Sequence, residues 1–375
     1  MIELRRIVLR EIRLPLRETF RISSGAVSQR RILLLELHDA SGVSAWSECV
    51  AGEVPNYSPE TVDTAWLAIV HWVAPRVLGR CFEAPGDVHP VLEADFRGHR
   101  MAKAAVEMGM WVLESLQLGL PLARLLGGTR NRIAVGISLG IQPDPLSLVA
   151  RVAEACHRGY RKIKVKIAPG ADVEWLRAVR EALGHSVPLM ADANNAYTLD
   201  DSDRLAALDD LDLMMLEQPL AWDDLVRHAE LQRRLRTAIC LDESITSLER
   251  AQDMVTLGSG RIVNIKPGRV GGFSQSLAVH DYCQSAGIPV WCGGMLESGI
   301  GRAYNVALAS LPNFTLPGDI SPSERYWEQD IVYPEWRMDR EGNIAVPLDR
   351  PGLGIEVDRE RIEALTVRSE VVELR

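Results

Sequence analysis

The sequence lacks the features that mark membrane, nucleic-acid-binding or disulfide-bonded proteins. No apolar stretch approaches the roughly 18 residues of a membrane span, and no long block of Lys and Arg is present. The net charge of −9 and the pI of about 5.5 argue against nucleic acid or an anionic membrane as a partner. The six cysteines form no Cys-x-x-Cys pair, which predicts reduced, buried thiols rather than disulfides or zinc ligands. The first residues lack the apolar segment and cleavage site of a signal peptide, so we expect a cytoplasmic protein.

The length of 375 residues suits two domains better than one. We expect residues 1–125 to form an α+β domain of antiparallel strands followed by helices, with helical segments near 59–78 and 98–117. Strand-like and helical segments then alternate through residues 126–329. The final segment, residues 330–375, loses this alternation, and we expect it to pack back on the first domain.

The alternation between residues 126 and 329 predicts a parallel α/β barrel. Eight short apolar runs are strand candidates, at 133–140, 162–167, 187–192, 213–217, 238–242, 262–266, 288–292 and, less clearly, 313–317. Helical stretches lie between them, at 146–158, 173–183, 199–208, 248–257 and 273–286. Nothing resembling a Gly-x-Gly-x-x-Gly fingerprint follows the first strand, which argues against a Rossmann-type sheet. We therefore expect a TIM-like barrel.

Five charged residues stand at nearly even intervals, each at or near the end of a predicted strand. They are Lys166, Asp192, Glu217, Asp242 and Lys266, separated by 26, 25, 25 and 24 residues. Such an interval matches one strand, one helix and two loops. Because all strands of a parallel barrel end at one mouth, the pattern predicts that these side chains gather there.

Lysines alternate with aliphatic residues along the segment 162–167, so the two sets face opposite sides of the strand. The aliphatic side suits the helices outside the barrel, which leaves Lys164 and Lys166 facing the interior. Burial and neighbouring positive charge both lower the pKa of an interior lysine. We therefore expect a lysine that is partly neutral near pH 7 and acts as a base.

Asp192, Glu217 and Asp242 close three consecutive strands. A single Asp at a strand end is most often a helix cap or a turn residue, but three neighbouring carboxylates repel one another unless a cation lies between them. With no His or Cys nearby, this oxygen-only set predicts Mg²⁺ or Mn²⁺. Lys266 lies four strands from Lys166, so the two lysines can reach opposite faces of the α-carbon of a metal-bound carboxylate.

Motifs around these residues resemble, in the same order, those of the enolase superfamily, muconate-lactonising subgroup. They are Lys164-Val165-Lys166, Asp192-Ala193-Asn194, Glu217-Gln218-Pro219, Asp242-Glu243-Ser244 and Lys266-Pro267-Gly268. The resemblance covers essentially the whole chain. It implies a (β/α)7β barrel, a capping domain formed by the N-terminal region and the C-terminal tail, and a homo-oligomer that acts on a small-molecule carboxylate. It also implies Mg²⁺ ligands at Asp192, Glu217 and Asp242, an acid/base pair at Lys166 and Lys266, and Lys164 as the residue that tunes Lys166.

Two differences from the motifs of other subgroups narrow the choice of subgroup that this sequence resembles. No histidine follows the seventh predicted strand, which disfavours the mandelate-racemase type of site. Asp319 is followed by Ile320 and Ser321, so the Asp-x-Asp pattern of dipeptide epimerases is incomplete. The segments that resemble the o-succinylbenzoate synthase/N-acylamino acid racemase group are 136–141, 293–302, 316–319 and 325–327.

That second resemblance implies two reactions that both begin by removing an α-proton. One is the dehydration of 2-succinyl-6-hydroxy-2,4-cyclohexadiene-1-carboxylate to o-succinylbenzoate, a step in menaquinone synthesis. The other is the racemisation of N-succinyl or other N-acyl amino acids. Dehydration needs one base, Lys166, with Lys266 as a cation, whereas racemisation needs both lysines to exchange protons. A dipeptide epimerase, a muconate cycloisomerase-like enzyme and a non-catalytic barrel that binds an acidic metabolite remain as alternatives.

Further residues are candidates for contact with the substrate. They are Ser138, Asn194, Gly294, Met295 and Asp319, together with Phe20 and Tyr57 in the capping-domain loops 20–25 and 53–57. Either aromatic side chain can equally serve domain packing. Arg269, three residues past Lys266, is either a neighbour that depresses the pKa of Lys266 or a solvated loop arginine.

Overall fold

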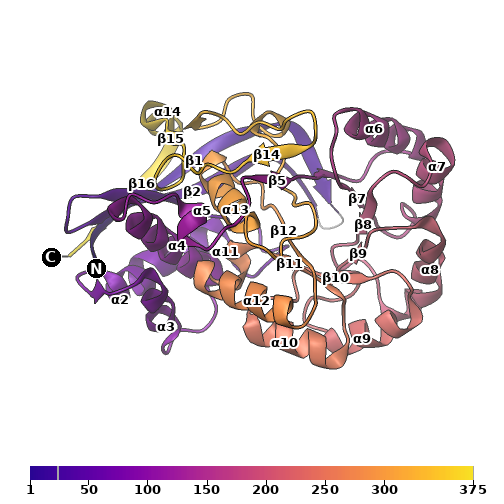
Figure 1. Cartoon of the computed structure of the whole chain (residues 1–375), viewed down its shortest axis with the longest axis horizontal. Helices are drawn as coiled ribbons and strands as arrows, with labels where there is room; N and C mark the ends of the chain where they lie inside the picture. Colours follow the sequence, from indigo (N-terminus) through magenta and orange to yellow (C-terminus); the bar gives the residue numbers. More distant parts are fainter. Residues whose placement is uncertain (23–24, 375) are drawn as a thin grey trace.

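The capping domain is built on an antiparallel sheet that uses both ends of the chain. The computed structural model describes residues 1–22 and 25–374. The strand order is β16-β1-β2-β3, with β4 paired to the start of β1 (Figure 1). Because β16 lies antiparallel beside β1, the C-terminal segment packs on the first domain. The strands are β1 Ile2–Ile22, β2 Gly25–Asp39, β3 Ser44–Cys49, β4 Cys81–Phe82 and β16 Thr366–Glu373.

The main helix of the capping domain is α4, Arg100–Gln117, which packs against β2 and β3. Side chains are buried around most of its circumference, which suits a helix between the sheet and the second domain. The predicted helix at 59–78 is interrupted by a π-helical turn, and it begins at Val62 because Thr61 caps it. The smaller segments are α1 Val62–Ala68, the π turn Ile69–Val73, α2 Ala74–Val77, a 3-10 turn Pro85–Asp87, α3 Val88–Glu93 and α5 Leu122–Leu125.

A curled sheet of seven parallel strands forms the second domain, in the order β12-β11-β10-β9-β8-β7-β6 (Figure 1). Each strand lies within a predicted one, and the predicted α/β fold, a TIM-like barrel with a capping domain, is confirmed. The strands are β6 Ile137–Leu139, β7 Ile163–Lys166, β8 Leu189–Asp192, β9 Leu216–Glu217, β10 Ile239–Leu241, β11 Ile262–Ile265 and β12 Val290–Cys292.

The remaining side of the barrel differs from the prediction. Residues 313–317, all within the described part of the chain, form no strand, and an isolated bridge joins Gly318 to Val135 instead. Pro317 has no N–H group to donate to a ladder, which explains why pairing is so short here. The first predicted strand is also divided, because its beginning, β5 Arg132–Ala134, pairs with β14 Asn343–Ala345 of the C-terminal segment.

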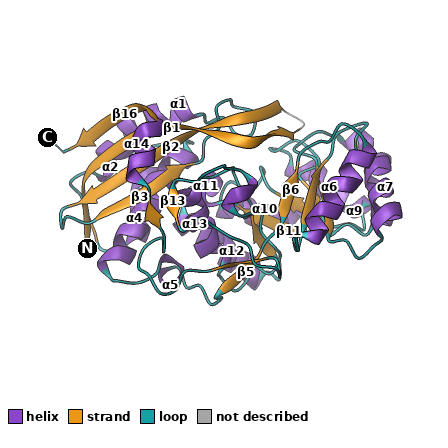
Figure 2. Cartoon of the chain, turned by 90° about the horizontal axis from the view of Figure 1, so that it is seen from above, coloured by secondary structure: helices purple, strands orange, loops and turns teal. Residues whose placement is uncertain are grey.

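Helices follow the barrel strands and cover the outside of the sheet (Figures 1 and 2). They are α6 Pro145–His157, α7 Val173–Leu183, α9 Leu225–Arg234, α10 Leu248–Leu257, α11 Pro267–Val270, α12 Phe273–Ser285 and α13 Gly299–Ala309. The predicted helix at 199–208 is three short pieces, a 3-10 turn Leu199–Asp201, α8 Ser202–Ala206 and a 3-10 segment Ala207–Leu211. The last elements are a 3-10 turn Ser323–Arg325, β13 Val332–Tyr333, β15 Glu356–Val357 and α14 Arg359–Leu365.

Side chains inside the barrel lie in layers, because alternate residues of each strand point inward. A small buried cluster, separate from the main core, consists of Met190, Met215, Cys240, Ile262 and Trp291. The members on β8 and β10 and the one just before β9 each lie two residues ahead of a predicted metal ligand. The apolar cluster therefore forms the layer below the charged mouth of the barrel, and we call it the barrel floor.

The hairpin of β1 and β2 extends from the capping domain over the barrel (Figure 2). Its backbone is joined to the barrel loops, since the N–H of Arg17 donates to the carbonyl of Tyr326 at an N–O distance of 2.9 Å. The N–H of Ile141 likewise donates to the carbonyl of Arg21 at 3.1 Å. The hairpin thus carries capping-domain side chains to the barrel mouth.

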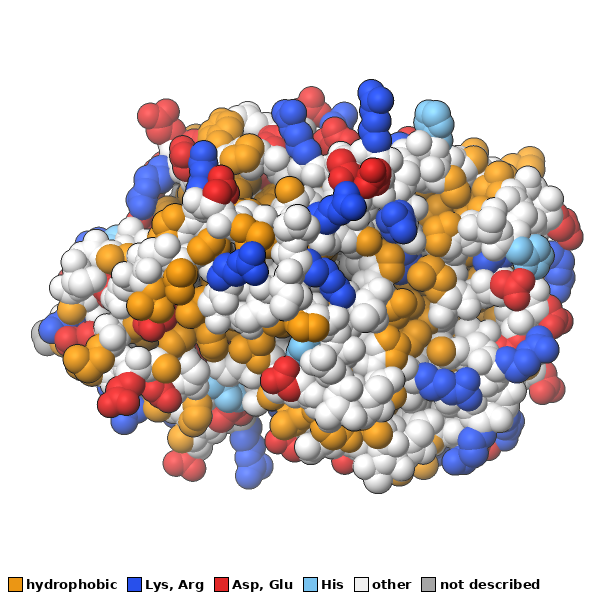
Figure 3. Space-filling model, in the orientation of Figure 1, with side chains coloured by type: hydrophobic (Ala, Val, Ile, Leu, Met, Phe, Trp, Pro, Cys, Tyr) orange, Lys and Arg blue, Asp and Glu red, His pale blue; other side chains and the backbone are white. Residues whose placement is uncertain are grey.

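Surface features of the chain are mixed in character. Basic and acidic side chains are interspersed on the face shown in Figure 3. The prediction of buried cysteines holds for four of the six but is wrong for Cys81 and Cys156, which are exposed. Within residues 1–22 and 25–374, none of the helices combines the length and the apolar character that crossing a bilayer requires.

Candidate active site

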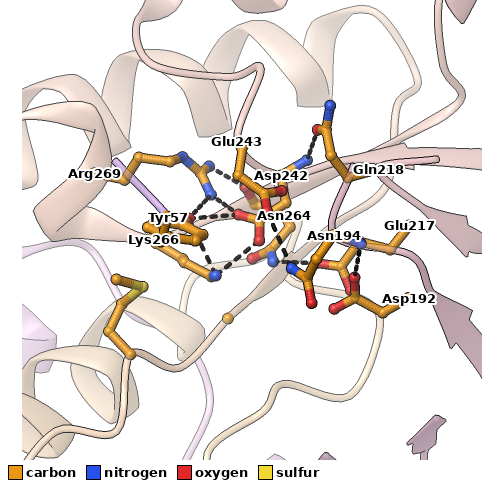
Figure 4. Close-up of polar contacts among 12 residues, drawn as sticks. Tyr57, Asp192, Asn194, Glu217, Gln218, Asp242, Glu243, Asn264, Lys266 and Arg269 are labelled. Atoms are coloured by element: carbon orange, nitrogen blue, oxygen red, sulfur yellow. Dashed lines mark hydrogen bonds and ion pairs between the residues drawn. The ribbon is translucent and has the colours of Figure 1, made fainter. Parts of the chain in front are cut away.

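The predicted catalytic and metal-ligating side chains meet at the carboxyl mouth of the barrel. Figure 4 shows the three carboxylates and Lys266. Strand register places Lys166 beside Asp192, and Asp192 beside Glu217. Asp242 follows β10, and Lys266 follows β11, four strands from Lys166 in the sheet. All five are buried, the two lysines being 8% and 5% exposed. Three carboxylates therefore lie between two lysines on separate walls of the barrel.

Lys164 and Lys166 project from β7 toward the carboxylates, as the alternation of lysine and aliphatic residues predicts. Lys166 Nζ donates to Asp192 Oδ2 at 2.5 Å and to Asn194 Oδ1 at 2.6 Å. Lys164 Nζ lies 3.1 Å from Asp192 Oδ2 and 3.2 Å from Glu217 Oε2. One wall of the site thus consists of two ammonium groups that share a carboxylate.

Lys266 is held by partners from both domains (Figure 4). Its Nζ donates to Asp242 Oδ2 at 2.8 Å and to Tyr57 Oη, from the capping domain, at 3.1 Å. Arg269 Nη1 donates to the same Tyr57 Oη at 3.2 Å and also to Asp242 Oδ1. Arg269 is only 3% exposed, so its interpretation as a solvated loop arginine is wrong.

The pKa values of Lys164 and Lys266 are raised, contrary to the expectation that an interior lysine has a lowered pKa. Burial on its own lowers the pKa of Lys266, but Asp242 and Tyr57 outweigh burial, and the net pKa lies well above the usual one. Arg269 does lower this pKa, though by less than Asp242 raises it. For Lys164, burial is likewise outweighed by Asp319 and the other nearby carboxylates, and its pKa is raised. For Lys162, by contrast, burial outweighs the nearby Asp319, and the pKa is lowered.

The buried carboxylates are electrostatically unequal. Burial and the negative charge of Asp192 raise the pKa of Glu217 to about 8. Burial also raises the pKa values of Asp192 and Asp242, but neighbouring lysines outweigh it, and both pKa values lie below their usual range. Asn264 Nδ2 donates to Glu217 Oε1 at 2.8 Å. Glu217, the central carboxylate of the three, is therefore the one whose negative charge is least neutralised by nearby positive charges.

The donor set of the mouth fits a hard divalent cation. Carboxylates on adjacent strands offer the oxygen ligands that Mg²⁺ and Mn²⁺ prefer, and a cation there relieves the repulsion that raises the pKa of Glu217. Within the described ranges, however, no three His, Cys, Asp or Glu side chains converge closely enough to enclose an ion. The carboxylates are turned toward the lysines and Arg269 instead. The assignment of Asp192, Glu217 and Asp242 as metal ligands stays a prediction.

A cavity of about 470 Å³ lies over the lysines, between the barrel mouth and the capping domain. Two hollows of similar volume flank the β1–β2 hairpin, but the site lysines do not line them. Ser138 Oγ is buried in the mouth with no hydrogen-bond partner among the described residues. Two members of the predicted loop 20–25, Ser23 and Ser24, lie outside those residues. The cavity lining includes all the predicted substrate contacts: Phe20, Tyr57, Ser138, Asn194, Gly294, Met295 and Asp319.

Three polar residues for which the sequence predicts no role also belong to the site. Asn264 contacts Glu217, and Lys162 Nζ lies 3.2 Å from Asp319 Oδ1. Glu243 Oε1 accepts a hydrogen bond from Asn194 Nδ2 at 3.0 Å, and burial and the charge of Asp242 raise the pKa of Glu243 to about 7. The period of two along a strand points to Asn264 and Lys162, since each lies two residues before an inward lysine.

Comparisons with known proteins match both domains. Residues 4–127 match the family model described as mandelate racemase/muconate lactonizing enzyme, N-terminal domain, and residues 147–361 match the one described as enolase C-terminal domain-like. The o-succinylbenzoate synthase of Geobacillus kaustophilus is 49% identical over 96% of this chain and 95% of that protein. The N-succinylamino acid racemase of Thermus thermophilus is 47% identical over 96% of each chain. A solved enolase-superfamily structure from Listeria innocua has a TM-score of 0.96 at 37% identity and covers 100% of both chains.

Proposed function

Because the chain belongs to the enolase superfamily, we propose that it is an enzyme that removes the α-proton of a carboxylate substrate with the aid of Mg²⁺. The reaction is the dehydration that forms o-succinylbenzoate for menaquinone synthesis, the racemisation of N-succinylamino acids, or both. One observation carries this proposal: Lys166 and Lys266 stand on separate walls with three buried carboxylates between them.

The roles follow from where each group lies. Asp192, Glu217 and Asp242 are the proposed ligands of Mg²⁺, which when bound stabilises the negative charge that develops on the substrate carboxylate. Lys166 Nζ, in its neutral form, accepts the α-proton on one side. Lys266 faces the other side, where it stays a cation during dehydration or exchanges a proton with the α-carbon during racemisation.

The surroundings of Lys266 bear on which reaction the site performs. Asp242 and Tyr57 raise the pKa of Lys266, which favours its ammonium form. That form suffices for dehydration, and it is also the proton donor for racemisation in one direction. Racemisation in the opposite direction requires Lys266 to be neutral. The surroundings of Lys266 therefore favour its role as a cation or as the proton donor.

A dipeptide epimerase is disfavoured by the arrangement around Asp319. Position 321 is a serine, and the Asp319 carboxylate is already contacted by Lys162 and Lys164. A carboxylate that neutralises two buried lysines has little charge left to bind the ammonium group of a dipeptide.

Exchange of the α-proton in D₂O tests the proposal. The protein is incubated with Mg²⁺ and N-succinyl-phenylalanine, exchange is followed by NMR, and formation of o-succinylbenzoate from the cyclohexadiene substrate is measured in parallel. We expect Lys166→Ala and Lys266→Ala to lower racemisation and dehydration by about 100- to 10,000-fold. Lys266→Arg should retain part of the dehydration because the positive charge remains.

The control is Arg177→Ala, which removes a cation from a partly exposed position on α7. Wild-type rates in Lys166→Ala would contradict the assignment of the base. Binding of the N-succinyl compound without exchange or dehydration would instead identify a non-catalytic barrel that binds acidic metabolites.

A further inference from the structure

Three lysines in and just before β7 point inward, and two carboxylates from other segments lie against them. Lys162, Lys164 and Lys166 point into the barrel at every second position and are 0%, 4% and 8% exposed. Asp319 contacts the first two of these lysines, and Asp192 contacts the last two. The five side chains form a ladder that rises from the barrel floor to the mouth.

Lys162, at the lower end of the ladder, has no part in the roles proposed above. Lys162 Nζ lies 3.2 Å from Asp319 Oδ1 and 3.2 Å from the centroid of the Trp291 ring. Neither Lys162 Nζ nor Asp319 Oδ1 has a hydrogen-bond partner among the described residues, so their contact is an ion pair without hydrogen-bond geometry. Burial of an ammonium group is costly, and Asp319 and the Trp291 ring are the groups that offset this cost for Lys162.

Asp319 is in turn the nearest neighbour of Lys164. Lys164 Nζ lies 2.5 Å from Asp319 Oδ2, but 3.1 Å from Asp192 Oδ2 and 3.2 Å from Glu217 Oε2. The shortest contact is thus to the carboxylate outside the proposed metal ligands. Without Asp319, the Lys164 ammonium group would have only Asp192 and Glu217 to neutralise its charge.

We propose that Asp319, anchored by Lys162 over Trp291, is a positioning residue that draws Lys164 toward the barrel floor and so weakens the hold of its ammonium group on Asp192 and Glu217. This inference rests on the proposed function, because it takes Asp192 and Glu217 to be ligands. The Lys164 ammonium group thus competes with the divalent cation for Asp192 and Glu217, and Asp319 weakens that competition.

Binding of Mn²⁺ alone, with no substrate present, tests the inference. Free Mn²⁺ is measured by EPR in titrations of the wild type, Asp319→Asn, Lys164→Met and the double variant. Partners that orient metal ligands typically contribute about 10- to 100-fold to metal affinity, and we expect a loss of that size in Asp319→Asn. In the Lys164→Met background the same substitution should cost little, because the competing ammonium group is gone.

Variants of Lys162 provide a second measurement if Asp319→Asn does not fold. Lys162→Met should lose Mn²⁺ affinity in the same way, whereas Lys162→Arg should retain it, because a guanidinium keeps the charge and stacks on Trp291. An unchanged affinity in Lys162→Met, or an equal loss from Asp319→Asn in both backgrounds, would overturn the inference. If the wild type does not bind Mn²⁺, both the proposed metal ligands and this inference are wrong. If Asp192→Asn abolishes Mn²⁺ binding but Asp319→Asn does not weaken it, only the positioning role of Asp319 is wrong.

Discussion

Tyr57 is the capping-domain residue that contacts Lys266, and removing its hydroxyl tests whether this contact positions Lys266 for proton transfer. Tyr57→Phe deletes one oxygen and keeps the ring that lies over Lys266 Nζ at 4.4 Å from the ring centroid. The hydroxyl accepts from Lys266 and Arg269 and donates to Asp242 Oδ1 at 2.9 Å. The substitution therefore removes one of the two hydrogen bonds of the Lys266 ammonium group and leaves the one to Asp242.

The size of the effect follows from these contacts. A hydrogen bond to a charged group contributes about 1.5–3 kcal/mol, and each 1.36 kcal/mol in a barrier is about tenfold in rate. Because Asp242 still holds Lys266, we count one bond and expect racemisation of N-succinyl-phenylalanine to slow by about 10- to 100-fold. Dehydration should change far less, since it needs only the positive charge of Lys266.

Both rates are measured on the same preparation, the first by polarimetry and the second by the absorbance of the aromatic product. The matched control is Tyr333→Phe, which deletes a hydroxyl that contacts Asp358 Oδ2 at 3.0 Å on an exposed surface. Equal losses in both reactions would refute the reasoning, because they would indicate a general distortion of the site. Unchanged racemisation would refute it too, because the hydroxyl would then not position Lys266.

Three other changes have definite expected outcomes. Removal of divalent cations with EDTA should abolish α-proton exchange, and Mg²⁺ or Mn²⁺ should restore it; exchange by the metal-free protein would contradict the ligand assignment. Glu107→Ala should lower the free energy of unfolding in urea by about 3 kcal/mol. The reason is that Glu107 accepts hydrogen bonds from the backbone N–H groups of Phe273 and Ser274 at 2.7 and 2.9 Å, and these donors would lose their partner. A loss smaller than the error of the urea titration would contradict this expectation. Burial raises the pKa of Glu48 to about 7, so the folded chain keeps a proton that the unfolded chain releases above its usual pKa of about 4.3. The free energy of unfolding should accordingly fall between pH 4.3 and 7 by up to about 4 kcal/mol and then level off. Glu48→Gln, compared with the wild type at pH 5 and 8, should remove that fall.

Periodicity along single segments accounts for what the sequence predicts well. Helices α7 and α10 run over 173–183 and 248–257, the ranges predicted from the sequence, and the structure shows that Asp172 and Ser247 cap them. The inward orientation of Lys164 and Lys166 follows in the same way from the period of two along β7. These features depend on neighbouring residues alone, so no knowledge of distant contacts is needed.

Contacts between distant segments account for what the sequence leaves open. The hydrogen bond from Lys266 to Tyr57 joins residues 209 positions apart, and no local pattern marks it. The direction of the pKa shift of Lys266 depends on such neighbours, which is why burial alone predicts the wrong sign. The expected strand at 313–317 fails for a related reason, because strand pairing depends on partners that the apolar run itself does not reveal.

The first and last strands of the capping sheet are neighbours, although nearly the whole chain separates them. While the protein is being synthesised, the edge of β1 that β16 later covers has no partner until residues 366–373 emerge from the ribosome. At about 5–20 residues per second, the stretch between Ile22 and Thr366 takes about 17 to 70 seconds to translate. An uncovered strand edge readily pairs with other chains. Nascent chains are therefore most exposed to misassembly during synthesis of the barrel. The capping domain begins first in the chain, but its sheet is completed only after the barrel has been synthesised.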